Sequence, residues 1–171
     1  KAEDLEEVWQ ILLASLKDAV DMLINMRNAE GQKLQEDIIR KSETIKGYLN
    51  KIEEKAPELV VQYKAKLTER LKELLDMTQL DENRINMELA IFADKSSVDE
   101  EITRLNSHIS QLRDTLHNNE PVGRKLDFIV QEMNREANTI ASKSSDLEVT
   151  NYALNIKNEI EKIREQIQNI E

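Results

Sequence analysis

Two glutamates one helical turn apart are the first candidates for chemistry in this sequence. Glu132 and Glu136 have the i, i+4 spacing that places both carboxylates on one face of a helix. Carboxylate oxygens are the ligands that Mg²⁺ and Mn²⁺ prefer, so the pair predicts a shared divalent cation. Asp127 is a further candidate ligand, but it lies almost half the helix circumference from Glu136. One ion would therefore need help from another element to reach both.

A histidine supplies a second kind of reactive group. His108 is one of two histidines, and it lies on the flank of an apolar seam, on the same stripe as Glu101 and Arg104. It could serve as a metal ligand or as a general base. The alternative is an ordinary, partly buried histidine that makes a hydrogen bond. His117 falls near an expected loop and is predicted to be incidental.

Cationic and amide side chains accompany these acids. A guanidinium suits bidentate contact with a phosphate, and an ammonium suits contact as a point charge. The alternative is that each cation neutralises a neighbouring glutamate in a helix laced with salt bridges. Phe128 projects on the polar side, where it could stack on a base or contact another domain. The candidate phosphate and substrate contacts are Arg104, Arg124, Lys125, Gln131, Arg135, Asn138 and Lys143.

One predicted helix, residues 121–143, must position most of these groups. Its polar arc uses Asn, Ser and Thr, which are mediocre helix formers, so their presence suggests that their side chains make contacts. Its core face follows 3-4 spacing and comprises Leu126, Ile129, Val130, Met133, Ala137 and Ile140.

The rest of the chain reads as further helices. Apolar 3-4 spacing predicts one helix, or two nearly in line, from about Glu3 to Lys55, and Ala56-Pro57 predicts a break before a second helix. These two should form an antiparallel hairpin. Asp81 opens a short helix, and the Ser-x-x-Glu form of Ser97 to Glu100 predicts a capping box for the next. The last helix follows Asp146.

Composition agrees with helices. The chain has 171 residues, 34% charged and 4% aromatic, with three glycines and two prolines, too few for many tight hairpins. The predicted fold is all-α: a long, coiled-coil-like helical hairpin followed by a C-terminal antiparallel helical bundle. The predicted domains are residues 1–95 and 96–171.

Other function classes lack support in the sequence. Without cysteine there is no thiol nucleophile, thiolate metal site or disulfide, which fits the cytoplasm. A net charge of −10 argues against a broad basic surface for nucleic acid. No phosphate loop, Ser-His-Asp set or nucleotide fingerprint is present, nor is a run of about 18 apolar residues that would predict a membrane span.

Three ordered stretches resemble the C-terminal signature of the bacterial YicC/YloC family of endoribonucleases. They cover about half of the chain, which makes chance an unsatisfactory explanation. The family opens with an N-terminal domain carrying a Ser-Met-Thr-Gly-Phe-like motif, which this chain lacks, so we expect the chain to be a C-terminal portion. The stretches are Asp99-Glu100-Glu101-Ile102-Thr103-Arg104-Leu105-Asn106-Ser107-His108; Gly123-Arg124-Lys125-Leu126-Asp127-Phe128 with Gln131-Glu132-Met133-Asn134-Arg135-Glu136-Ala137-Asn138-Thr139 and Ser142-Lys143; and Glu161-Lys162-Ile163-Arg164-Glu165-Gln166-Ile167-Gln168-Asn169-Ile170-Glu171.

The resemblance implies an endoribonuclease that cuts single-stranded RNA, with a divalent metal, Mg²⁺ or Mn²⁺. We expect the metal ligands to be Asp127, His108, Glu132 and Glu136, with Arg135 joining His108 and the two glutamates as catalytic residues. The expected partners are RNA, the family's N-terminal domain and further copies of the chain, in the cytoplasm and away from membranes. The homo-oligomer follows because a helix longer than its own bundle leaves an apolar face uncovered.

Two catalytic mechanisms and one non-catalytic role remain open at this point. In the first, carboxylates hold an ion that activates water, and Arg or Lys stabilises charge on the phosphate. In the second, His108 acts as base for attack by a ribose 2′-hydroxyl without a metal. The third makes the chain a helical oligomerisation scaffold, in which the polar stripe is an interface and has no catalytic activity.

Overall fold

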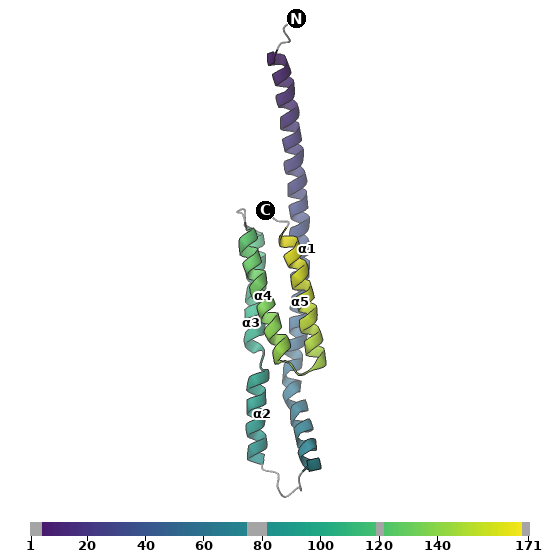
Figure 1. The fold of residues 1–171 in the computed structure, drawn as a ribbon, viewed down its shortest axis with the longest axis vertical. Helices are drawn as coiled ribbons and strands as arrows, with labels where there is room; N and C mark the ends of the chain where they lie inside the picture. Colours follow the sequence, from purple (N-terminus) through teal and green to yellow (C-terminus); the bar gives the residue numbers. More distant parts are fainter. Residues whose placement is uncertain (1–4, 75–81, 119–121, 169–171) are drawn as a thin grey trace. The chain divides into compact units, whose positions relative to one another are not determined.

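The computed structural model describes residues 5–74, 82–118 and 122–168, and every regular element in these ranges is a helix (Figure 1). Asp81 and Pro121, expected at helix starts, and Glu3 lie outside the described residues. The predicted all-α fold is confirmed. The helices are α1 (Leu5–Leu74), α2 (Glu82–Ser96), α3 (Asp99–Leu116), α4 (Gly123–Lys143) and α5 (Leu147–Ile167).

The chain divides into two units, Lys1–Ile38 and Ile39–Glu171. In the described part of the first unit the chain is helical, and large apolar side chains such as Leu5, Leu12 and Leu23 are at least half exposed. Within the described residues, no helix combines the length and apolar character that a membrane span requires. The predicted domain boundary between residues 95 and 96 stays a prediction.

The second unit contains a helical bundle. Helices α3, α4 and α5 run alternately up and down, and α4 packs against both of its neighbours (Figure 1). Their 3-4 seams form the core, in which Leu105, Met133 and Ile160 are fully buried. This confirms the predicted antiparallel bundle, because narrow apolar seams can be buried only by packing helices side by side.

Side chains of α1 from Ile39 onward also join this bundle. Tyr48 stacks on Tyr152 of α5, with ring centroids 6.1 Å apart. The Arg113 guanidinium of α3 donates from Nε to the buried Ser42 hydroxyl at 2.9 Å. The α1 ammonium of Lys55 pairs with Asp146 at the start of α5. These contacts fix α1 against the first and last helices of the bundle.

The predicted helix break at Ala56-Pro57 is wrong. Helix α1 continues through Pro57 to Leu74, so the two segments that were expected to form an antiparallel hairpin are parts of one helix, and that hairpin is wrong as well. The seam explains this, because Ile52 and Leu59 on either side of the proline are both buried at heptad spacing. Burial of a continuous seam outweighs the backbone hydrogen bond that Pro57 cannot donate. Tyr63 of α1 stacks on Phe92 of α2, and their ring centroids are 3.8 Å apart.

The capping box at Ser97 is also wrong, whereas the cap of the last helix is well formed. Val98 is the N-cap of α3 and offers no side-chain acceptor, and the Ser97 hydroxyl donates to the Asp99 carboxylate at 3.1 Å. The Asp146 carboxylate accepts hydrogen bonds from the amides of Glu148 and Val149, as expected for an aspartate N-cap.

Replacing Pro57 by Ala should stabilise the bundle. The substitution restores a helical N–H and removes a proline penalty of about 3 kcal/mol, less up to about 1 kcal/mol from the freer unfolded chain. We expect the free energy of unfolding in urea to rise by about 2 kcal/mol. Glu58→Ala, at the adjacent exposed residue, is the control and should change it by less than about 0.5 kcal/mol. Equal stability of the two variants would contradict this explanation.

Candidate active site on helices α3 and α4

Helix α4 presents its predicted core face to the bundle, and this expectation is confirmed. The polar side chains therefore divide between two places: a flank directed towards α3, which carries Glu132 and Glu136, and an outward surface. The buried apolar residues are Leu126, Ile129, Val130, Met133, Ala137 and Ile140.

The flank towards α3 contains a group of potential metal ligands. One ligand atom from each of His108, Glu132 and Glu136 lies within 4.8 Å of the others. Glu136 is buried, while His108 and Glu132 are half-buried. The structure thus brings together three of the four expected ligands from two helices. We name these three residues the ligand cluster.

Asp127 does not join the ligand cluster in the described structure. Its carboxylate accepts a hydrogen bond of 2.7 Å from the side-chain amide of Gln131, one turn further along α4. The reason is the helical geometry noted from the sequence, since Asp127 and Glu136 lie on opposite sides of α4.

The imidazole of His108 has an unusual environment. Its Nδ1 atom is buried and has no hydrogen-bond partner among the described residues. A buried polar nitrogen without a hydrogen-bond partner costs free energy, and a bound ion or water or a catalytic role is the usual explanation. Two carboxylates and an unpartnered imidazole nitrogen at this spacing suit a divalent cation, whose ligands lie about 2.0–2.6 Å from the metal. These residues could therefore hold a divalent cation, and the metal stays a prediction.

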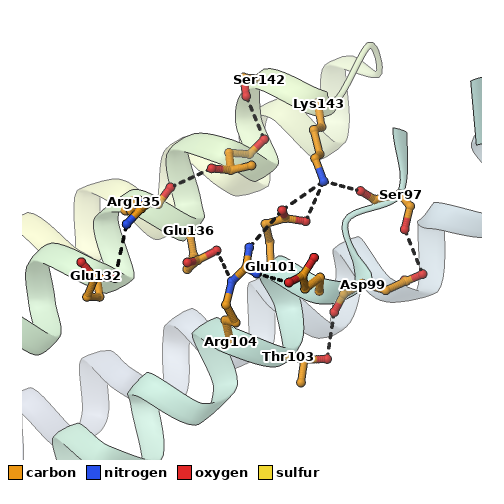
Figure 2. Close-up of polar contacts among 12 residues, drawn as sticks. Ser97, Asp99, Glu101, Thr103, Arg104, Glu132, Arg135, Glu136, Ser142 and Lys143 are labelled. Atoms are coloured by element: carbon orange, nitrogen blue, oxygen red, sulfur yellow. Dashed lines mark hydrogen bonds and ion pairs between the residues drawn. The ribbon is translucent and has the colours of Figure 1, made fainter. Parts of the chain in front are cut away.

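Arg104 links the ligand cluster to a second buried acid (Figure 2). Its Nε lies 3.0 Å from Oε2 of Glu136, an ion pair that falls outside the geometry of a directed hydrogen bond. Its Nη2 donates to Glu101 at 3.2 Å, and its Nη1 pairs with Glu100. The contact with Glu136 is the main cause that raises the pKa of Arg104 above its ordinary value. Arg104 was expected to bind substrate, and here its guanidinium holds carboxylates.

Lys143 completes this arrangement from the end of α4 (Figure 2). Its ammonium donates to both oxygens of Glu101, at 3.0 and 3.1 Å, and to the backbone carbonyl of Ser97 at 3.0 Å. Lys143 was also expected at the substrate, and in the structure it fastens the end of α4 to the start of α3. We call Glu101, Arg104, Glu136 and Lys143 the ion-pair lock.

Sequence reasoning missed Glu101 as a structural residue. Only 4% of its side chain is exposed, the smallest exposure among the ion-paired acids of the described residues. A signal was available, because Glu101 shares a helical stripe with Arg104 and His108. A carboxylate on the flank of a seam, three residues before an arginine, could have been recognised as a buried ion pair.

The other predicted site residues lie on the outward surface of α4. Arg135 has 75% of its side chain exposed, and its Nη1 is 3.8 Å from a Glu132 oxygen. Arg124, Lys125, Gln131 and Asn138 are exposed as well. The structure therefore separates the candidate substrate contacts into an outward set and the two cations of the ion-pair lock.

The ion-pair lock predicts unequal effects for two adjacent glutamates. Glu101→Gln removes a buried charge that accepts charge-assisted hydrogen bonds from two cations, and should lower the free energy of unfolding by about 1.5–3 kcal/mol. Glu100→Gln, whose side chain is 76% exposed, should lower it by at most about 0.5 kcal/mol. Urea unfolding measures both. Equal losses would show that burial of the lock contributes nothing.

Comparison with known proteins finds matches to one family. The family described as "Endoribonuclease YicC-like, C-terminal" matches residues 52–171, which include α2 to α5 and α1 from Ile52 onward. A protein from Clostridioides difficile named "Probable endoribonuclease YicC" is 49% identical over the whole chain. A protein of the same name from Haemophilus influenzae is 36% identical over 99% of the chain.

The two relatives match all or nearly all of the chain, but only part of each relative is covered. The chain spans 59% and 58% of the lengths of these two relatives. The family match covers both helices of the ligand cluster and the whole ion-pair lock. This chain belongs to the YicC-like endoribonuclease family and carries the region that defines the family's C-terminal part.

Proposed function

We propose that this chain carries the metal-binding part of an endoribonuclease that hydrolyses phosphodiester bonds in single-stranded RNA. The observation that supports the proposal most directly is the ligand cluster, which places one ring nitrogen of His108 within 4.8 Å of two carboxylates, together with the lack of a hydrogen-bond partner for the Nδ1 of this histidine. The names of the relatives supply the reaction class, since both are probable endoribonucleases. Buried, unpartnered polar groups of this kind concentrate at functional sites.

The donor set favours Mn²⁺ or Mg²⁺ as the cofactor. Carboxylate oxygens suit both ions, and an imidazole nitrogen raises the relative affinity for Mn²⁺. The bound ion would supply Lewis acidity and lower the pKa of a coordinated water. Glu136 would hold the ion with Glu132 and His108 while its Oε2 atom also contacts Arg104.

The outward side chains of α4 would handle the substrate. Arg135 stands beside Glu132, where its guanidinium could stabilise the charge that develops on a phosphate. Arg124 and Lys125 supply further positive charge near the start of α4, and the amides of Gln131 and Asn138 supply hydrogen-bonding groups. For Arg104 and Lys143 we propose a supporting role, since both already neutralise buried carboxylates.

His108 also supports a second candidate mechanism. A neutral imidazole with an unpartnered nitrogen can accept a proton, so His108 could be the base that activates a ribose 2′-hydroxyl. This reaction needs no metal. The attacking oxygen then belongs to the RNA itself rather than to water, and the two mechanisms therefore require different substrates.

Assembly and location complete the proposal. The first unit exposes Trp9, Leu12 and Leu16 by more than half, which fits further copies of the chain covering this face. We therefore propose a homo-oligomer that acts in the cytoplasm with a further domain like that of its longer relatives. A scaffold without catalytic activity is the alternative from another class, and RNA cleavage separates it from both enzymatic mechanisms.

The ligand cluster predicts loss of metal affinity on removal of a single ligand. His108→Ala and Glu132→Gln should each weaken Mn²⁺ binding at least about 10-fold, measured by calorimetric titration. Glu161→Gln, an acid of α5 that is 53% exposed, is the control and should leave the affinity unchanged. Unchanged affinity in both ligand variants would remove the metal site and leave the metal-free mechanism and the scaffold as the alternatives.

A single deoxyribose separates the two mechanisms. With RNA that lacks the 2′-hydroxyl only at the cleaved position, metal-assisted attack by water should proceed within about 10-fold of the normal rate, whereas attack by the 2′-hydroxyl is abolished. The measurement is the rate of cleavage at that bond with Mn²⁺ and with EDTA. Cleavage in EDTA that disappears with the deoxy substrate would transfer the proposal to the second mechanism.

A further inference from the structure

The outward surface of α4 carries a line of side chains that the bundle does not use. The line is separate from the flank that bears the ligand cluster, and it lies opposite the core face. Its members follow one another at alternating spacings of four and three residues, and all are exposed. We call this line the outer stripe: Arg124, Phe128, Gln131, Arg135, Asn138 and Ser142.

Phe128 is the member that packing explains least. Its side chain is 62% exposed, although a phenylalanine normally buries a large part of its ring in a core or an interface. The core face of α4 is already complete without it. An exposed aromatic ring in a row of polar residues is the arrangement that proteins use to stack unpaired bases.

The charge of the outer stripe is opposite to that of the chain. The sequence has a net charge of −10, yet the stripe contains two arginines, and the acid beside it, Asp127, accepts a hydrogen bond from Gln131. Among the described residues Arg124 has no hydrogen bond or ion pair, and Arg135 has one loose pair, 3.8 Å from Glu132. Arg124 and Arg135 are therefore the groups of the stripe that suit a phosphate, on a chain that is acidic as a whole.

From these observations we infer that the outer stripe binds a short run of single-stranded RNA, with one base stacked on Phe128 and phosphates held by Arg124 and Arg135. The two arginines are about 16 Å apart along the helix axis, on either side of the ring. Gln131 and Asn138 lie on the same line, where their amides can reach base edges or riboses. A double helix would not bind in this way, because its bases are already stacked and paired.

The inference rests on the proposed function and extends it. Arg135 belongs to the stripe and also neighbours Glu132 of the ligand cluster. RNA held along the stripe would therefore pass beside the ligand cluster, with its position set by stacking rather than by sequence. This accounts for an acidic chain acting on RNA, since attraction is confined to one line on one helix.

Binding without cleavage tests the stripe directly. The 171-residue chain is titrated into a fluorescein-labelled ten-nucleotide polyuridine in EDTA, and the anisotropy gives the dissociation constant. Phe128→Ala should weaken binding about 5- to 100-fold, the range for loss of one stacked base. Phe128→Trp should bind at least as tightly. Leu154→Ala, at an apolar residue of α5 that is 47% exposed, should match the unsubstituted chain.

Salt dependence and fluorescence give two independent readouts. Arg124→Gln and Arg135→Gln should each reduce the slope of log affinity against log salt by about 0.7, the value for one phosphate contact on a single strand. In a Trp9→Phe background, the tryptophan introduced by Phe128→Trp should be quenched by the polyuridine and not by an RNA duplex of equal length.

Each outcome decides between named explanations. Equal affinities of Phe128→Ala and the unsubstituted chain, or no measurable RNA binding by the unsubstituted chain, overturn the inference. If Phe128→Ala instead changes the subunit number in light scattering and leaves RNA affinity unchanged, the stripe is a protein interface. If the chain neither binds Mn²⁺ nor cleaves RNA, but Phe128→Ala still weakens its RNA binding, the proposed metal site is removed and the RNA-binding stripe stands.

Discussion

Two buried carboxylates between α3 and α4 constrain this site more than any other feature. Glu101 and Glu136 lie on different helices, and each is within 5% of full burial. A carboxylate taken out of water is costly unless cations and hydrogen bonds replace the lost solvation. Arg104 contacts both acids and Lys143 contacts Glu101, so the charges balance only when α3 and α4 keep one register. That register also brings His108, one turn after Arg104, to the carboxylates of α4.

Helix α4 has three different surroundings: the core, helix α3 and the solvent. One face of α4 fills the core, the flank towards α3 holds the acids, and the side opposite the core carries exposed Arg and Phe. One residue cannot fill two of these roles, because a side chain that packs in the core cannot also reach solvent. The unusual composition of α4 follows from this division. Asn138 and Ser142 occupy outward positions where Glu or Lys would give a better helix.

What the sequence could and could not predict follows from the range of each interaction. Apolar periodicity is local, so it predicted the core face of α4 correctly. The rule that proline breaks helices is also local, and it failed at Pro57 because a seam buried on both sides maintains α1. The capping box predicted at Ser97 is wrong because α3 begins one residue later, with Val98 as its N-cap. Pairings between helices, such as Arg104 with Glu136, depend on register and are invisible in one sequence.

The ligand cluster was predictable because its residue types are rare or regularly spaced, whereas its supporting ion pairs are made from the commonest surface residues. This difference matters for the chemistry. A cation at Glu132 and Glu136 must share Glu136 with Arg104, and Arg104 is tied to Glu101 and, through that acid, to Lys143. Electrostatic coupling through a buried carboxylate is strong because little water screens it. At the proposed metal site, metal affinity and the stability of the α3 and α4 pair would therefore be coupled, and a substitution in the lock would alter both.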